Sequence, residues 1–537
     1  MPNSEVDKHC QTGFKLYSIL FGITIATLLI SLDASIIATA IPAISSQFNA
    51  ATDIAWYGAA YPLTMCALQP FSGKMSTIFS LRWTYLGFFA IFLLGSLICG
   101  AANSSTMFIV GRAIAGVGGS GVISGGLSGI ALVTPTAQRP LLTGLITSLY
   151  ALGTVIAPII GGALTSHASW RWCFYINLPS GAITVGTLLV FFHPPNTAAV
   201  RRSTVQKILQ LDLLGCGLFI PSIIMIFLAL QWGGGEYAWN SATIIGLFVG
   251  FVASILLFIA WEIRKGDNAM IPFRLLSDRS VVFSLLFAFL FMGAFMLPVY
   301  YLPEWFQIVK DASPMRSGVM LLPSVCTQIF AAIVSGLTAK HVGYYNPWFF
   351  LGSTMVCIAL GLYTTFTPTS TSSAKWIGFQ VLQGLGTGSA SQMALLTVQH
   401  VLKTTPRIIP IGISTVMFAQ YFGSAVMQTI AGSIFQNRLV SDLQSNAGLN
   451  STGIALLLEA GNAKVKETTT EAFPGRVDAV IAAYNKAITT VFYLAMASCV
   501  LAFIMSTGIR WTNISPPDTN KAGVTSETRS TDGEPQP

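Results

Sequence analysis

Apolar residues run along this chain in long, nearly unbroken stretches that are separated by short polar turns. A helix rises about 1.5 Å per residue, so about 20 apolar residues cross the hydrocarbon core of a bilayer. The pattern predicts about 14 such spans and an all-α polytopic membrane protein, because a transmembrane barrel needs short alternating segments instead. The predicted spans cover residues 17–41, 55–79, 84–102, 106–132, 141–165, 173–192, 211–231, 242–262, 281–303, 317–339, 347–366, 376–398, 411–435 and 487–509.

The spacing of these spans predicts two six-helix bundles with two additional helices between them. The polar tail after Trp511 is rich in Ser, Thr, Pro and Gly, and we expect it to be disordered. The predicted divisions are an N-terminal tail (1–16), a first bundle (17–192), a linker with two extra spans (193–280), a second bundle (281–510) with a long outer loop (436–486), and a C-terminal tail (511–537).

Composition supports a membrane protein and excludes a soluble one. Hydrophobic residues make up 53% and charged residues only 9% of the 537 positions, whereas soluble domains carry about 25% charged residues. The net charge of +8 reflects the bias of basic residues toward cytoplasmic loops and does not indicate nucleic-acid binding. About 18 of the Lys and Arg residues fall in predicted cytoplasmic segments and about 9 outside. This charge bias predicts that both termini are cytoplasmic. We also expect a monomer in the plasma membrane, with a vacuolar or vesicle membrane as the alternative.

The two halves of the chain carry related patterns. Arg112 begins RAIAGVG and Gln380 begins QVLQGLG, so (R/Q)-x3-G-x-G recurs in the fourth and twelfth predicted spans. The turns that start SGK at Ser72 and SGL at Ser335 are also alike. Repeats of this kind are a feature of transporters. Similar composition of Gly-rich helices is the alternative explanation.

Asp33 and Arg112 are rare charges inside apolar spans. A carboxylate in hydrocarbon costs at least a few kcal/mol, so it usually faces a cavity and has a function there. Counting along the two helices places both residues about 10 Å below the outer surface, where they could meet. Alternating exposure of Asp33 to the two sides would let it bind and release H⁺. A fixed Asp–Arg pair, or an Asp33 that is satisfied by backbone groups, is the structural alternative.

The fifth predicted span combines a helix-kinking proline with small residues. Pro158 removes an intrahelical hydrogen bond, and Gly153, Gly161 and Gly162 would let another helix approach closely. Such a helix suits a conformational switch between inward-open and outward-open states. Pro and Gly are also common in membrane helices generally.

Uncharged polar side chains within spans predict the solute path. A cavity of Gln, Tyr, Phe and Met suits a largely apolar solute better than a sugar or an ion, and we select Gln69, Tyr150, Gln380 and Gln420 as candidates. The sequence contains no Walker A motif, metal-ligand cluster or nucleophile arrangement, so we expect no enzyme activity, cofactor or metal. In the predicted outer loop, Asn450 begins the glycosylation sequon Asn-Ser-Thr.

Five motifs lie in order along the chain: LDASIIATAIP at 32–42, GKMSTIFSLR at 73–82, the fourth-span arginine motif at 112–121, GTVIAPIIGG at 153–162 and WRWCFYINLPSG at 170–181. In their order and spacing they resemble the motifs of the major facilitator superfamily, and in particular those of its 14-span drug:proton antiporters. The segment IAWYGAAYPLT from Ile54 also resembles fungal efflux carriers for toxins and other secondary metabolites.

The resemblance implies a proton-coupled exporter of a small lipophilic metabolite, toxin or drug that works by alternating access. It implies that Gly73 and Arg82 belong to the loop that controls the conformational switch. The loop departs from the family pattern, because the family's acidic residue falls at Thr77 here, and Ala157 replaces a glycine in the fifth-span motif. A proton-coupled importer, such as a siderophore-iron transporter, and a non-transporting membrane receptor are the alternatives.

Overall fold

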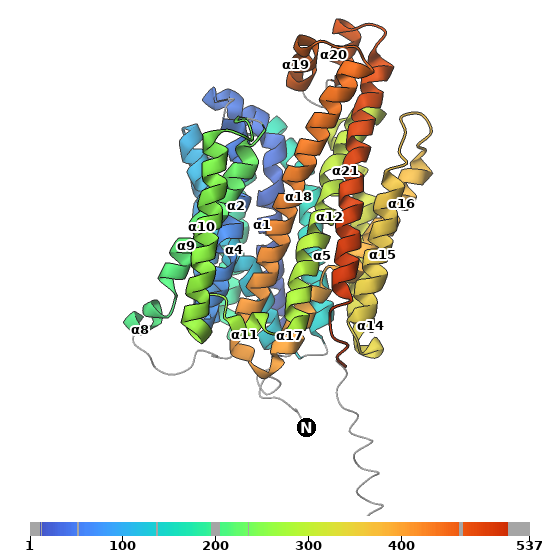
Figure 1. The fold of residues 1–537 in the computed structure, drawn as a ribbon. Helices are drawn as coiled ribbons and strands as arrows, with labels where there is room; N and C mark the ends of the chain where they lie inside the picture. Colours follow the sequence, from blue (N-terminus) through green and yellow to red (C-terminus); the bar gives the residue numbers. More distant parts are fainter. Residues whose placement is uncertain are drawn as a thin grey trace, which may run out of the picture.

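The structure is a computed structural model that describes residues 11, 13–50, 53–135, 138–194, 204–234, 236–460 and 465–513. Within these residues the fold is all-α, apart from one isolated bridge between Gly233 and Tyr237. Fourteen helices or helix pairs run lengthwise through the described part of the molecule (Figure 1). They are α1 (Gly13–Phe48), α2 (Ile54–Ile78), α3 (Leu81–Ala101), α4 (Ser105–Val133), α5 (Arg139–His167), α6 with α7 (Trp172–Tyr175 and Asn177–Phe191), α9 (Leu213–Trp232), α10 (Ala242–Lys265), α12 (Arg279–Lys310), α14 (Leu322–Val342), α15 (Asn346–Tyr363), α16 with α17 (Ser373–Ala390 and Met393–Val401), α18 (Ile409–Ser445) and α21 (Val477–Ser506).

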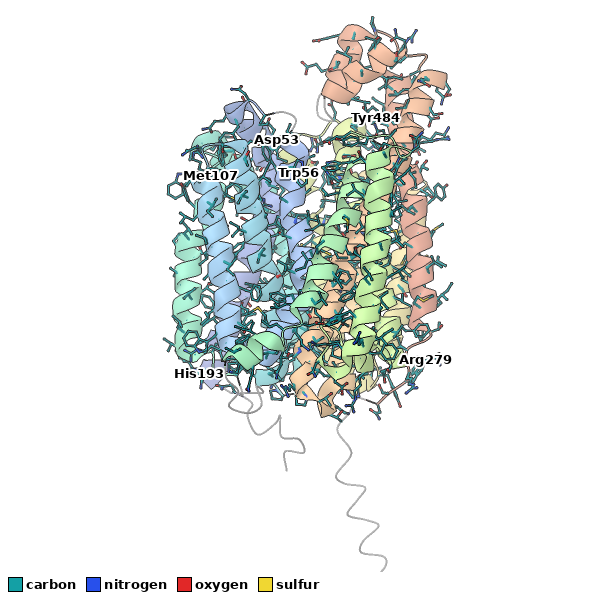
Figure 2. All side chains as sticks on the ribbon, turned by 60° about the vertical axis from the view of Figure 1, so that its left-hand side comes forward. Asp53, Trp56, Met107, His193, Arg279 and Tyr484 are labelled. Atoms are coloured by element: carbon teal, nitrogen blue, oxygen red, sulfur yellow. The ribbon has the colours of Figure 1, made fainter. Side chains whose placement is uncertain are left out.

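The remaining helices are short and lie at the two ends of the molecule. Figure 2 shows Asp53, Trp56 and Met107 at one end, which we call the cap face, and His193 and Arg279 at the other, which we call the terminal face. Helix α1 begins and α21 ends at the terminal face (Figure 1). The short α-helices are α8 (Thr204–Leu209), α11 (Phe273–Leu276), α13 (Pro314–Val319), α19 (Ser451–Ala460) and α20 (Val465–Ala472), and 3-10 turns cover Gly266–Asn268, Leu402–Thr404 and Pro406–Ile408.

Twelve helices of the described chain are long and apolar enough to cross a membrane. Helices α2 and α16 are not among the twelve, although they run beside the others in the bundle. Both carry buried polar residues, Gln69 and Lys74 in α2 and Gln380 and Gln383 in α16, which lower their mean hydropathy. A polytopic α-helical membrane fold is therefore established, and the count of 14 spans stays a prediction.

The helices fall into two groups with matching internal contacts. In the first group, α1 packs on α5 and α7, and α4 packs on α2 and α3. In the second group, α12 packs on α18 and α21, and α16 packs on α14 and α15. The groups meet along two seams, one between α2 and α18 and the other between α5 and α14. Helix α2 of the first group corresponds to α14 of the second, and α5 corresponds to α18, so the two seams are equivalent. The packing therefore has the two-fold repetition that the sequence predicts.

The repeated glycine motif occupies equivalent positions in the two groups. A Cβ atom on Gly116 of α4 would overlap the backbone oxygen of Tyr61 in α2. A Cβ atom on Gly384 of α16 would overlap the backbone oxygen of Ser324 in α14. Small residues at these points let helix backbones touch, as is common in membrane bundles. These glycines therefore serve packing in both halves.

Residues 436–486, which the sequence analysis treats as a long loop, are largely helical where the structure describes them. Helix α18 extends to Ser445, α21 starts at Val477, and α19 and α20 cover their ends at the cap face (Figure 1). Apolar side chains at helical spacing form a separate small core, which explains the difference. That core includes Leu439, Leu443, Leu457, Val465, Val480 and Tyr484.

The hairpin of α9 and α10 covers the seam between α2 and α18. Phe219 of α9 contacts Phe418 of α18, with ring centroids 5.2 Å apart. Trp232 at the other end of α9 contacts Trp56 of α2, with centroids 6.0 Å apart. The two extra helices therefore touch both groups at one seam and lie outside the two-fold repetition.

Candidate functional site

Asp33 and Arg112 meet in the interior of the first group. Nη1 of Arg112 lies 2.6 Å from Oδ2 of Asp33 and also donates to the Asp33 backbone oxygen at 3.2 Å. The two side chains are only 1% and 0% exposed. Asp33 is on α1 and Arg112 on α4, and each is nearer to the cap face than to the terminal face. Burying two charges is costly unless they are paired and hydrogen-bonded, and the pairing meets this requirement.

Asn177 completes the polar shell of this ion pair. Its Nδ2 donates to Oδ1 of Asp33 at 3.1 Å and to Oγ of Ser96 at 3.1 Å. Asn177 is 1% exposed and begins α7. Each carboxylate oxygen of Asp33 therefore has one side-chain donor, one cationic and one neutral.

The guanidinium of Arg112 is less completely satisfied. Its Nε and Nη2 atoms have no hydrogen-bond partner among the described residues. Its carbon Cζ lies 4.6 Å from the centroid of the Tyr61 ring, which provides a cation–π contact. A buried cation with free donors can accept a new partner when Asp33 is neutralised, so the pair need not be a fixed structural lock.

Three tyrosines extend the site from the ion pair to the middle of the molecule. Tyr61 lies within electrostatic range of Tyr150 on α5 and Tyr421 on α18. Tyr150 and Tyr421 also interact with each other across the two groups. A series of polar side chains thus links Asp33 with a contact between the two groups.

The four residues predicted to line the solute path occupy different places. Gln69 of α2 is fully buried, and neither atom of its amide has a partner among the described residues. Tyr150 is half-buried at the contact with Tyr421, and Gln420 is buried beside that tyrosine in sequence. Gln380 instead donates to the Met320 backbone oxygen at 3.0 Å, where it joins α16 to the start of α14. Gln380 therefore occupies the position in α16 that Arg112 occupies in α4.

The small residues of α5 differ from one another in their surroundings. A Cβ atom on Gly161 would lie 2.5 Å from Thr39 Oγ1, and one on Gly153 would overlap Ser31, so both permit the close approach of α1. A Cβ atom on Gly162 would meet nothing within 4 Å. Pro158 lies inside the continuous helix α5. Gly153 and Gly161 therefore form the contact with α1, and Gly162 does not contribute to it.

Gly73 marks a close contact between the groups at the terminal face. A Cβ atom on Gly73 would overlap Ser414 and lie 2.8 Å from the Pro410 backbone oxygen of α18. Gly336 of α14 is the counterpart, because its Cβ atom would lie 3.0 Å from the Pro140 backbone oxygen of α5. Gly73 thus contacts the first turn of α18, and Gly336 contacts the first turn of α5, each across one of the two seams. These two contacts hold the groups together at the terminal face in this conformation.

Arg82 has a different role from Gly73. Its Nη2 donates to the backbone oxygen of Leu189, and its guanidinium lies 5.3 Å from the centroid of the Trp83 ring. Arg82 therefore joins the start of α3 to the end of α7 within the first group. Neither of these two contacts crosses a seam.

Asn450 is exposed at the cap face and directly precedes α19. Its Oδ1 accepts a hydrogen bond from the Gly453 amide at 2.9 Å, which is the geometry of an N-cap. The amide nitrogen that would carry a glycan is not used by this bond. Glycosylation at Asn450 remains a prediction that the local geometry permits.

The described residues contain no group of three or more His, Cys, Asp and Glu side chains that could hold a metal ion. The residues that the sequence analysis missed are Asn177 and Ser96, which contact the ion pair or its partner. Asn177 is within the quoted motif WRWCFYINLPSG. The signal that would have selected it is a carboxamide at the start of an apolar span, where it has few partners within its own helix.

This fold and site define a polytopic membrane transporter of two repeated helical groups. Solved structures of the same fold include the proton:xylose symporter XylE bound to 6-bromo-6-deoxy-D-glucose, with a TM-score of 0.60 and 12% identity over 94% of this chain and 98% of that one. The human organic anion transporter MFSD10 (TETRAN) has a TM-score of 0.54 and 12% identity over 90% of this chain and 100% of that one. At this level of identity the likeness concerns the fold alone.

The sequence profile of the Major Facilitator Superfamily matches residues 23–428, and the chain belongs to that family. The MFS-type transporter poxA of Penicillium oxalicum is 44% identical over 508 residues, which cover 94% of this chain and 89% of the relative. The MFS-type efflux pump MFS1 of Arthroderma benhamiae is 42% identical over 94% of this chain and 92% of the relative. The efflux pump mokI of Monascus pilosus is 43% identical over 94% of this chain and 93% of the relative.

Proposed function

We propose that this transporter exports a small lipophilic metabolite, toxin or drug in exchange for protons, and that Asp33 is the group that binds the proton. The observation that carries the proposal is the buried pair of Asp33 and Arg112, which lies within an apolar bundle and connects through Tyr61 to the contact between the groups. Two relatives, MFS1 of Arthroderma benhamiae and mokI of Monascus pilosus, are named efflux pumps, which supports the direction of transport.

The proton step follows from the contacts of Asp33. While Asp33 is ionised, it holds the guanidinium of Arg112 at 2.6 Å. Protonation removes this charge pairing and leaves a buried cation on the ring of Tyr61. An uncompensated buried charge costs several kcal/mol, so Arg112 has to move toward a new partner or toward water. Movement of Arg112 would disturb Tyr61 and, through it, the tyrosines at the contact between the groups.

The substrate class rests on the polar groups available along the path. Gln69, Tyr61 and Tyr150 offer uncharged hydrogen-bonding groups, and aromatic rings of Phe418 and Phe422 lie nearby on α18. Such a lining suits an amphipathic organic solute with a few polar groups.

The conformational change separates the groups at the terminal face. In this conformation Gly73 and Gly336 bring the groups together there, and the opposite state requires both contacts to open. We take the terminal face as cytoplasmic because basic side chains gather there. These residues are Lys74, Arg82, Arg139, Lys265, Arg279 and Arg407. We take the membrane to be the plasma membrane.

Purified protein in vesicles with a pH gradient tests the proposal, with a fluorescent lipophilic cation and a neutral dye as probes. We expect the probes to move against the flow of protons, and collapse of the gradient with an uncoupler to stop the movement. Movement of probe in the same direction as protons would identify an importer. An absence of flux for both probes and for an iron–siderophore chelate, under any gradient, would contradict transport of these classes.

A further inference from the structure

Two buried carboxyl groups at the terminal end of the α9–α10 hairpin take no part in the mechanism above. Asp212, just before α9, is 2% exposed and accepts hydrogen bonds at Oδ1 from Trp261 Nε1 at 2.7 Å and from the Gly215 amide at 3.3 Å. Glu262, in the last turn of α10, is 7% exposed and accepts from the amides of Met270 at 3.1 Å and Ile271 at 2.8 Å.

The two carboxyl groups face the same small space. Oδ2 of Asp212 is buried and has no hydrogen-bond partner among the described residues. A Cβ atom on Gly215 would lie 2.5 Å from this oxygen and 3.1 Å from Oε1 of Glu262. Both oxygens therefore lie next to Gly215, on the same side of it. Two ionised carboxylates that are buried this close repel each other, and a single shared proton removes the repulsion.

Lys74 of α2 is the cation that faces the pair. Its Nζ is buried and donates to the backbone oxygens of Asn268 at 3.1 Å and Ala269 at 2.6 Å, in the turn that Glu262 also holds. Lys74 interacts electrostatically with both Asp212 and Glu262. One proton on the pair leaves a net charge of −1, which the ammonium balances, so the cluster as a whole is neutral.

The other titratable or charged groups around the cluster come from four elements. Lys265 of α10 lies over the Trp261 ring at 5.3 Å, and Arg407 before α18 interacts with Lys74. Asp267 borders the same cavity as Lys74, and the thiol of Cys216 in α9 faces the carboxyls while its Sγ donates to Leu211.

A cavity of about 230 Å³ at the terminal face reaches Lys74. Polar side chains, including Gln210, Asn268 and Arg407, line it. A cavity of this size and polarity has room for water, which would bring protons from the terminal side as far as Lys74, the cation of the cluster.

We propose that Asp212 and Glu262 form a second proton-binding site, which holds one shared proton and is linked through the turn at 268–271 to Lys74. Lys74 follows Gly73 directly, and Gly73 makes the contact with α18. Binding of a proton to the pair would therefore change how firmly the α9–α10 hairpin is attached to α2. This attachment lies at the terminal end of the seam between α2 and α18. The site is separate from Asp33, and the proposal does not depend on the direction or the substrate of transport.

Infrared spectroscopy of the full-length protein in lipid nanodiscs, titrated with pH, tests the proposal through the C=O stretch of protonated carboxyls. The background variant Asp33→Asn removes the contribution of Asp33. In this background we expect a protonated-carboxyl band at neutral pH that disappears in Glu262→Gln and in Asp212→Asn. Asp212→Asn keeps the test valid if Glu262→Gln fails to fold, because Asn can replace Asp as the N-cap of α9. Asp311→Asn is the control and should leave the band unchanged, since Asp311 is an exposed partner of Lys466.

Lys74→Met gives the sign of the coupling. Without the ammonium, the pair should take up its second proton at a pH higher by about one unit or more, so the band should grow at neutral pH. A band that survives both carboxyl substitutions, or a Lys74→Met titration identical to that of the background, would overturn the proposal. A band that appears only when Na⁺ is removed would show that the site is a cation site instead.

Discussion

Asp33 has three polar neighbours in the folded protein, and each comes from a different helix. Arg112 is on α4, Asn177 is on α7, and Ser96 on α3 is linked through Asn177. The arrangement joins four helices of the first group at one point. A change in the charge of Asp33 therefore alters the contacts of several helices at once.

Asn177→Ala should destabilise the protein, because Oδ1 of Asp33 loses its donor in a site without water-exposed alternatives. A buried acceptor left without a partner costs about 1–3 kcal/mol. Thermal unfolding in detergent measures the effect. Asn446→Ala is a matched control, since Asn446 is exposed and also donates to an aspartate, Asp442. Equal melting temperatures for the two variants would show that Asn177 does not support the ion pair.

Rare charges could be found from the sequence because they contrast with the apolar residues around them. Asp33 and Arg112 were selected in this way, and the helix rise placed them at the same depth. Asn177 and the pair of Asp212 and Glu262 were not selected. An amide or a carboxyl near a predicted span end is ordinary at an interface, and only tertiary packing shows that these groups are buried.

At the scale of elements, α5 contacts α1 along its small residues. Gly153 and Gly161 face α1, whereas Gly162 faces open space. The sequence motif includes all three glycines without distinguishing them. A helix has more than one face, and the sequence does not show which face meets which neighbour.

Gly161→Ala and Gly162→Ala form a matched pair that tests this contact. The added methyl group at 161 would press on Thr39 and Ile36 of α1, and overpacking of this kind costs about 1–3 kcal/mol. At 162 the methyl group meets nothing within 4 Å, and the higher helix propensity of Ala leaves stability unchanged or raises it by up to about 1 kcal/mol. Melting temperatures and flux of both variants provide the measurement. Equal effects of the two substitutions would argue against the contact of Gly161 with α1.

Pro158→Ala should slow turnover while solute binding largely persists. Proline has no amide hydrogen, so it leaves a carbonyl of the preceding turn of α5 without its helical partner. Alanine restores that hydrogen bond and stiffens a helix that contacts both α1 and, across the seam, α14. Binding by tryptophan fluorescence and flux in vesicles separate the two effects. Loss of binding with normal turnover would place Pro158 at the solute instead.

At the scale of the whole molecule, most of the architecture follows from the sequence. Long apolar stretches predicted the all-α bundle, and the repeated glycine motif predicted two related groups. The helices that the structure describes within residues 436–460 and 465–486 were not predicted, because the mixed composition of this segment is typical of a polar loop. Its small core forms only when α18 and α21 extend beyond the bundle and bring their apolar faces together.

The two faces should be on opposite sides of the membrane. In a variant without native reactive cysteines, a cysteine at position 450 should react with an impermeant reagent added to intact cells, because Asn450 is exposed at the cap face. A cysteine at position 513, which follows α21 at the terminal face, should react only after permeabilisation. Labelling at 513 but not at 450 in intact cells would reverse the proposed orientation.

The most direct test of proton coupling compares two modes of transport in vesicles that contain the wild type or Asp33→Asn. Coupled export requires Asp33 to bind and release a proton, whereas exchange of solute for solute across the membrane requires only the movement of the two groups. The account predicts that Asp33→Asn retains solute exchange and loses accumulation driven by a pH gradient. Accumulation by Asp33→Asn that matches the wild type in size and pH dependence would contradict it.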